Sequence, residues 1–200
     1  MMLRALATIV IVALFLLNWM LPSTEIGRRG PDESTRTDVE VTAVRVGEPM
    51  PDATLADLNG APVELSELRG QRVLIVFERS IDWCPFTKAR LLGLSQTFEE
   101  VPDLAIVWVM AAEQCSERTR RLIGEYGLRE RILFLADEQS ALIRELGLLK
   151  PEPDMMEEGV PHPTTVLVDR EGVVRFIDVR EDYHYWLDPG VLVAALDSLP

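Results

Sequence analysis

Cysteine, histidine and basic residues are all scarce in this chain of 200 residues. Two cysteines are too few for a disulfide-stapled scaffold or for a metal site with four thiolate ligands. With 20 Lys and Arg against 33 Asp and Glu, the net charge is −13, which argues against nucleic-acid binding because phosphates are neutralised by basic faces. Hydrophobic residues make up 48 %, so the chain is not a disordered acidic tail. The composition indicates an acidic folded protein and names no substrate.

One long apolar run is present near the N-terminus, from Ala5 to Leu21, and only two of its residues are polar. As a helix it would be about 25 Å long, close to the thickness of a bilayer core. The run predicts a transmembrane anchor over residues 1–22, which Pro22 ends. A cleaved signal peptide is the alternative, but the residues before Pro22 lack the small-x-small pattern that signal peptidase requires.

Charge divides the chain into two parts. The first thirty residues hold three arginines and one glutamate, and the 17 basic and 32 acidic residues that remain give the rest a net charge of −15. More basic residues follow the apolar run than precede it, and this difference favours a cytoplasmic location for the domain. A short N-terminal tail followed by an apolar run and a long domain is, however, the usual layout of a signal-anchor protein whose domain is exported. We expect the domain to be extracytoplasmic. Residues 23–45 predict a tether, and residues 46–200 predict one domain.

Within that domain, strand and helix patterns alternate. Continuous apolar runs predict buried strands, and alternating segments around the turns Asn59-Gly60 and Asp169–Gly172 predict hairpins. The predicted strands are residues 53–57, 63–65, 72–77, 104–110, 132–135, 164–168 and 173–177. The predicted helices are residues 85–98, 116–126, 138–146 and 191–199. Because right-handed crossovers impose parallel pairing of consecutive strands, the order predicts an α/β sandwich with a mixed sheet.

Cys84 follows the first buried strand and directly precedes Pro85, a residue suited to the first turn of a helix. Unpaired amides and the positive end of the helix dipole at such a position favour a thiolate. Reactive groups of open α/β sheets also gather at the carboxyl ends of strands. Cys84 is therefore predicted to be a nucleophile, with an inert buried thiol as the alternative. Glu78 and Asp82 lie nearby as possible proton carriers, although most such acids are solvated or paired.

Three segments resemble a known family. Trp83-Cys84-Pro85-Phe86-Thr87 resembles the W-C-x-x-C site of thioredoxin-fold proteins, with Thr87 in place of the second cysteine. The segment that begins His162-Pro163-Thr164 resembles the cis-proline strand of that fold, and residues 47–52 resemble the G-x-x-x-P-D opening of redoxins. Over residues 46–199 the chain is thus similar to the alkyl hydroperoxide reductase and thiol-specific antioxidant proteins. The resemblance implies a thioredoxin-like three-layer sandwich with a mixed central sheet.

The resemblance also implies roles for individual residues. Cys84 matches the attacking cysteine, and Pro163 matches the cis-proline that packs on the sulfur and leaves backbone open to a substrate chain. Thr87 cannot resolve a mixed disulfide, but its hydroxyl could donate to the Cys84 thiolate. The peroxiredoxin signature P-x-x-x-T-x-x-C is absent. Candidates to supply the missing charge and donor, or to support the site, are Arg79, Ser80, Trp83 and Pro85.

The second thiol, Cys115, follows the strand predicted beside residues 72–77, so both cysteines lie beyond one sheet edge. A loop movement would bring them within the roughly 4.4–6.8 Å between Cα atoms that a disulfide spans. Cys115 is thus either a resolving thiol or a bystander. A copper site is a further alternative, but the close cysteine pair is missing, and we predict neither metal nor cofactor. Its remaining ligands would be His162, His184, Met155 and Met156. The aromatic residues 183–186 suggest packing or a partner-binding lip.

Together these features predict a membrane-tethered thiol-dependent oxidoreductase of antioxidant or peroxidase type, with Cys84 as its single attacking cysteine. Its expected partners are a peroxide or protein-disulfide substrate, an external thiol reductant and a membrane, with no nucleic acid. Two alternatives remain: a thiol-disulfide oxidoreductase acting on protein disulfides, or a non-catalytic module that binds extended chains beside Pro163.

Overall fold

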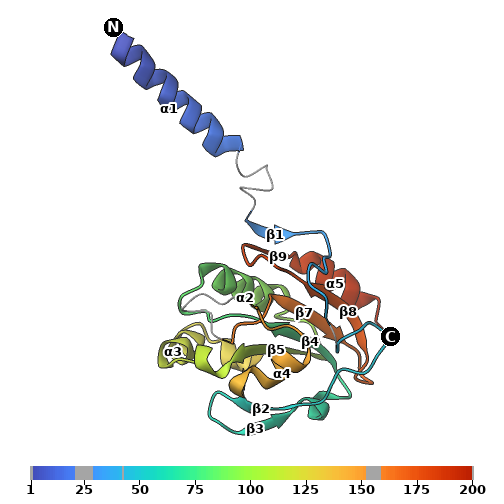
Figure 1. The fold of residues 1–200 in the computed structure, drawn as a ribbon. Helices are drawn as coiled ribbons and strands as arrows, with labels where there is room; N and C mark the ends of the chain where they lie inside the picture. Colours follow the sequence, from blue (N-terminus) through green and yellow to red (C-terminus); the bar gives the residue numbers. More distant parts are fainter. Residues whose placement is uncertain (1, 21–28, 42, 152–158, 200) are drawn as a thin grey trace.

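The computed structural model describes residues 2–20, 29–41, 43–151 and 159–199 (Figure 1). The strands are β1 (Gly30–Asp32), β2 (Thr54–Asp57), β3 (Pro62–Glu64), β4 (Arg72–Phe77), β5 (Leu104–Ala111), β6 (Ile132–Asp137), β7 (Thr164–Val168), β8 (Val174–Val179) and β9 (Tyr185–Leu187). The α-helices are α1 (Met2–Met20), α2 (Pro85–Thr97), α3 (Glu117–Glu125), α4 (Ala141–Glu145) and α5 (Pro189–Asp197).

Seven strands form the central sheet, in the order β3-β2-β6-β5-β4-β7-β8. The core strands β4, β5 and β6 are parallel, while β7, β8 and the β2–β3 hairpin are antiparallel to their neighbours. The mixed sheet predicted from the sequence is thereby confirmed. The predicted adjacency of the two strands that precede the cysteines is confirmed as well, because β4 pairs directly with β5.

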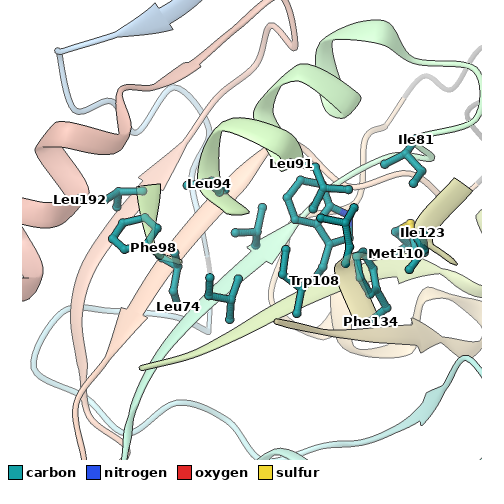
Figure 2. Packing of buried hydrophobic residues seen from close by; sticks show 14 of the residues in the cluster. Leu74, Ile81, Leu91, Leu94, Phe98, Trp108, Met110, Ile123, Phe134 and Leu192 are labelled. Carbon is teal, nitrogen blue, oxygen red and sulfur yellow. The ribbon is translucent and has the colours of Figure 1, made fainter. Parts of the chain in front are cut away.

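Alternate residues of each central strand enter two hydrophobic cores on opposite faces of the sheet, which gives three layers. On one face, Leu91 and Leu94 of α2 pack with Ile123 of α3, Leu192 of α5 and Trp108 of β5 (Figure 2). On the other face, α4 packs against β4, β5 and β6. The core therefore fixes α2, and with it Cys84, above the carboxyl end of β4.

Local signals placed the ends of α2 and α3 to within one residue, whereas the helix predicted over residues 191–199 lies two residues earlier, as α5. Cys84 is the N-cap of α2 and Pro85 is its first residue, and the Ser116 hydroxyl caps α3 by accepting from the Thr119 amide at 3.0 Å. The helix predicted over residues 138–146 starts late, at Ala141, because Gln139 and Ser140 adopt positive φ angles of 55° and 50°. The Asp137 carboxylate takes over the capping by accepting from two amides of the first helical turn.

Part of the segment predicted as a tether is structured. We call residues 29–38 the strap: its strand β1 pairs in parallel with β9, and neither strand was predicted. Buried Asp32 accepts from Arg180 at 2.9 Å, and Arg180 also pairs with Asp178 at 2.8 Å. Burial opposes ionisation of Asp32, but hydrogen bonds from Ser34 and Arg180 outweigh it and hold its pKa well below the usual range. The strap is thus anchored by an ion pair between distant parts of the chain.

The apolar run predicted as an anchor over residues 1–22 forms the helix α1. Figure 1 shows α1 pointing away from the sheet, and its large apolar side chains from Leu6 to Met20 are exposed. Within the described residues, no helix reaches the length and apolarity that crossing a membrane requires. The spanning part of the prediction is therefore not confirmed.

Candidate functional site

Cys84 lies at the end of the loop that connects β4 to α2, where the sequence predicted it. Its amide donates to the Ser80 carbonyl oxygen at 3.4 Å, and its own carbonyl accepts from the Lys88 amide at 3.2 Å as the first helical hydrogen bond. Only 2 % of the residue is exposed. The thiol therefore sits at the positive end of α2, in a position that is closed to large molecules without a structural change.

A buried polar network lies below the first turn of α2, and the carboxylate of Glu78 is its centre. Arg90 donates to Glu78 Oε1 at 2.6 Å, with 4 % of each side chain exposed. Thr87 Oγ1 donates to Glu78 Oε2 at 2.9 Å, and the amide of Arg79 donates to the same oxygen at 3.1 Å. The hydroxyl proton of Thr87 is thus directed to Glu78, so the expected donation to Cys84 is wrong.

Arg90 also donates to the hydroxyl of Thr165 on β7, and so connects α2 to the strand that follows Pro163. The sequence analysis did not single out Arg90, because an arginine in an amphipathic helix is most often exposed. A signal was present: Arg90 falls three residues after Thr87 and four before Leu94, on the helix face that is buried. The network holds the loop of Cys84 against the sheet.

Ser80, predicted as a donor to the site, serves the loop instead. Its hydroxyl donates to Asp82 Oδ1 at 2.9 Å and also lies 2.9 Å from the Thr119 hydroxyl. Ser116 donates to the other oxygen of Asp82 at 2.8 Å. Asp82 is therefore paired with hydroxyls rather than poised as a proton carrier, and the loop before Cys84 is tied to the start of α3.

Aromatic side chains lie near Cys84. Trp83 precedes it and Phe86 follows it in the sequence, and the rings of Tyr183 and His184 contact Phe86. We call these four residues, Trp83, Phe86, Tyr183 and His184, the aromatic rim. The ring of His184 stacks on Tyr183 with centroids 4.2 Å apart and meets the edge of Phe86 at 4.8 Å. The guanidinium of Arg79, the predicted positive charge, lies 3.8 Å from the Tyr183 centroid and 5.4 Å from that of Trp83. Tyr183 and His184 of the predicted aromatic cluster thus pack beside the site, whereas the Tyr185 ring lies against the guanidinium groups of Arg36 and Arg180.

Pro163 follows a trans peptide bond, since the described residues contain no cis bond, and the expectation of a cis-proline is wrong. A trans bond is the favoured state, and here the Pro163 carbonyl accepts from the Arg180 amide at 2.9 Å, continuing the β7–β8 pairing. The His162 amide donates to the Leu148 carbonyl at 2.7 Å, and the His162 carbonyl accepts from the Thr164 hydroxyl. The backbone expected to bind a substrate chain is already hydrogen-bonded within the protein.

Cys115 is buried in the hydrophobic core on the face of the sheet that α2 and α3 cover. Both cysteines are free thiols. Burial raises the pKa of Cys115 to about 11, with Arg120 partly offsetting it and Glu113 adding to it. A thiol with that pKa is protonated at neutral pH and is a poor nucleophile. The environment of Cys115 therefore favours the bystander over the resolving thiol.

The copper alternative finds no assembled ligand set. Nowhere in the described parts of the chain do three or more His, Cys, Asp or Glu side chains gather as a metal site would need. Met155 and Met156 lie outside the described residues. His184 pairs with Asp182 at 2.6 Å, and burial lowers the pKa of His162, with nearby Lys150 adding to the effect.

Comparison with known proteins supports this description. The family described as AhpC/TSA matches residues 46–177, whereas no curated protein matches the chain. Among solved structures, a thiol peroxidase from Chromobacterium violaceum is 20 % identical, with a TM-score of 0.65 over 80 % of this chain and 92 % of that one.

Two further structures share the fold. A peroxiredoxin-like protein from Aquifex aeolicus is 13 % identical, with a TM-score of 0.67 over 78 % of this chain and 88 % of that one. A secreted disulfide oxidoreductase from Mycobacterium tuberculosis is 19 % identical, with a TM-score of 0.55 over 74 % of this chain and 96 % of that one. At these identities the likeness establishes the thioredoxin-like α/β fold.

Proposed function

The chain belongs to the AhpC/TSA family and is a thiol-dependent oxidoreductase, and on that basis we propose that it reduces small hydroperoxides with Cys84 as the single attacking thiol. The observation that carries this proposal is the closed site. Cys84 is 2 % exposed, and the backbone groups of His162 and Pro163 are engaged internally. A protein disulfide or an extended chain needs a sulfur open to a large molecule and free backbone groups, whereas a hydroperoxide of few atoms needs only enough room to bring one oxygen to the sulfur.

The proposed oxidation is a two-electron transfer to the peroxide. The Cys84 thiolate attacks one peroxide oxygen, the O–O bond breaks, and the departing alkoxide or hydroxide takes a proton to become an alcohol or water. Cys84 is left as a sulfenic acid. Cys84 lies at the positive end of the α2 dipole, and Arg79 places a positive charge beside Trp83 and Tyr183.

The proposed reduction uses an external thiol, because Thr87 stands where a resolving cysteine would. One thiol attacks the sulfenic sulfur, which releases water and forms a mixed disulfide with Cys84. A second thiol attacks the outer sulfur of that disulfide, so the Cys84 thiol is restored and the reductant leaves as its own disulfide. Glu78, Thr87 and Arg90 keep the start of α2 fixed through the cycle.

The proposal predicts a strong substrate preference in the full chain. With dithiothreitol as reductant, hydrogen peroxide should be consumed well above the uncatalysed rate, while the reduction of insulin disulfides should stay at the rate of dithiothreitol alone. Both reactions are measured with the same protein, one by residual peroxide and one by insulin turbidity. Insulin reduction without peroxide consumption would instead support a thiol-disulfide oxidoreductase. If the protein shows neither activity, the non-catalytic binding module is the hypothesis that stands.

We also propose that α1 attaches the domain to a membrane, with the domain extracytoplasmic. The support is the apolar run of residues 5–21 and the exposed apolar side chains of α1. The double substitution Val10→Arg/Leu14→Arg should move the protein from the membrane pellet to the soluble fraction. Each introduced arginine costs about 2.5–3.5 kcal/mol at the centre of a bilayer. Equal membrane recovery of the variant would contradict attachment.

The orientation is tested in the same cells. A cysteine at the exposed position Arg118→Cys should react with a membrane-impermeant maleimide in intact cells if the domain is extracytoplasmic. Labelling only after lysis would place the domain in the cytoplasm.

A further inference from the structure

The strap makes contacts at its start that reach the surroundings of Cys84. At its start, the Arg29 guanidinium lies 5.8 Å from the centroid of Phe86, and the Gly30 amide donates to the carbonyl of His184 at 2.8 Å. Two members of the aromatic rim are thus bound directly by the strap. Figure 1 shows β1 lying beside β9, on the side of the domain from which α1 extends.

Further along, the strap is anchored to the body of the domain. Asp32 pairs with Arg180 inside the protein, and the carbonyl of Asp32 accepts from the Asp188 amide at 2.8 Å. The Arg36 amide donates to Asp178 at 2.8 Å, and Asp38 bonds to Val179 at 3.0 Å. These anchors fix where Arg29 and Gly30 meet the rim. Because most of the strap's side chains are exposed, few apolar contacts oppose its separation from β9.

We infer that the strap governs the size of the molecules that reach Cys84, by holding Phe86 and His184 of the aromatic rim in place beside it. The inference rests on the proposed function and concerns the reduction of oxidised Cys84 by an external thiol. A hydroperoxide of few atoms can enter the closed site, but the external thiol must bring its sulfur into contact with the Cys84 sulfur. With Cys84 2 % exposed, a bulky thiol requires the rim to move.

The contacts show how the rim would move. Phe86 and His184 are in edge contact, and His184 stacks on Tyr183, which in turn carries Arg79. Loss of the Gly30 hydrogen bond and of the Arg29 contact therefore removes the strap's hold on a connected group of rings, of which His184 stays paired with Asp182. Trp83 also lies beside Arg79, but it is held in addition by its hydrogen bond to Gln114 at 3.0 Å. Strap separation thus loosens the rings that the strap holds and leaves Trp83 bound to Gln114.

Access can be measured with two reagents of the same chemistry and different size. Cys84 in the full chain is labelled with N-ethylmaleimide and with a maleimide coupled to a polyethylene glycol chain, and the Cys84 peptide is followed by mass spectrometry. In Arg29→Ala/Asp32→Asn, the ratio of the bulky to the small labelling rate should rise about tenfold or more, since local opening depends exponentially on the contacts removed. The matched control is Arg118→Ala/Asp197→Asn, two exposed positions away from the strap, which should keep the wild-type ratio.

Hydrogen exchange at the Gly30 and Asp188 amides reports whether the strap has separated. Faster exchange at both amides with an unchanged ratio of labelling rates would overturn the inference, and so would equal acceleration of both reagents. Unchanged exchange at both amides in the double variant would also overturn the inference, because the contacts on which it rests would then not hold the strap. The surface variant Arg29→Ala alone repeats the measurement if the double variant does not fold. Labelling rates do not depend on peroxidase activity, so failure of the proposed function is seen separately, in peroxide consumption.

Discussion

Cys84→Ser in the full chain is expected to lower the rate of hydrogen peroxide consumption on the order of 10³-fold or more, the usual cost of removing an essential nucleophile. A serine hydroxyl stays protonated at neutral pH and forms neither a sulfenic acid nor a mixed disulfide, so both halves of the cycle are lost. Serine is close to cysteine in size, and the buried position at the start of α2 accepts it. The rate is measured with dithiothreitol in excess, after subtraction of the uncatalysed reaction.

Cys115→Ser is the matched control. Cys115 is buried and its pKa is raised to about 11, so the remaining thiol of Cys84→Ser stays protonated and cannot substitute for the lost one. We expect Cys115→Ser to keep peroxide consumption within a few-fold of wild type. A loss as large as that of Cys84→Ser would make Cys115 the resolving thiol. A Cys84→Ser protein as fast as wild type would end the peroxidase proposal.

The second large effect is on stability. Arg90→Met should lower the free energy of unfolding by about 3–5 kcal/mol, because it leaves the buried carboxylate of Glu78 without its cation. The Thr87 hydroxyl and the backbone amide of Arg79 still donate hydrogen bonds to that carboxylate, but neither of these two donor groups is charged. In a chain of this length the melting temperature should fall by roughly 6–20 °C. Urea unfolding and thermal melts measure both quantities.

Two control variants distinguish the cost of leaving a buried charge unpaired from the cost of losing an ion pair in general. Arg131 pairs with Glu99 at the surface, where the side chains are 44 % and 49 % exposed, so Arg131→Met should cost only about 0–1 kcal/mol. Glu78→Gln added to Arg90→Met removes the stranded charge and should recover part of the lost stability. A cost below about 1 kcal/mol for Arg90→Met would mean that the pair does not stabilise the domain.

The central strands and the start of α2 could be predicted because their signals are local. A strand buried on both faces reads as an unbroken apolar run, as in β4 and β5, and Pro85 marks the first turn of a helix by its missing amide hydrogen. These two features place Cys84 at the carboxyl end of a core strand before any tertiary contact is known. The position of Cys84 in the fold is therefore predictable from the sequence.

The surroundings of Cys84 were not predictable in the same way. Glu78 and Arg90 are charged residues whose burial depends on each other, and no local pattern records a pairing between a strand end and a helix. The hydroxyl of Thr87 has one proton, and its direction was decided by that buried carboxylate. Pairing of β1 with β9 depends likewise on residues at opposite ends of the chain. Tertiary partners decided what these residues do.

The separation of the strap's partners in sequence has a consequence for biosynthesis. Asp32 and Arg180 are 148 positions apart, so the ion pair that anchors the strap forms only after residue 180 has left the ribosome. By then β4, β5 and α2 have been synthesised, whereas β9, which carries the strap, comes last before α5. During synthesis Cys84 therefore precedes the residues that place the strap against the aromatic rim, and the nascent protein passes through an interval in which the proposed attacking thiol lacks the strap contacts to Phe86 and His184.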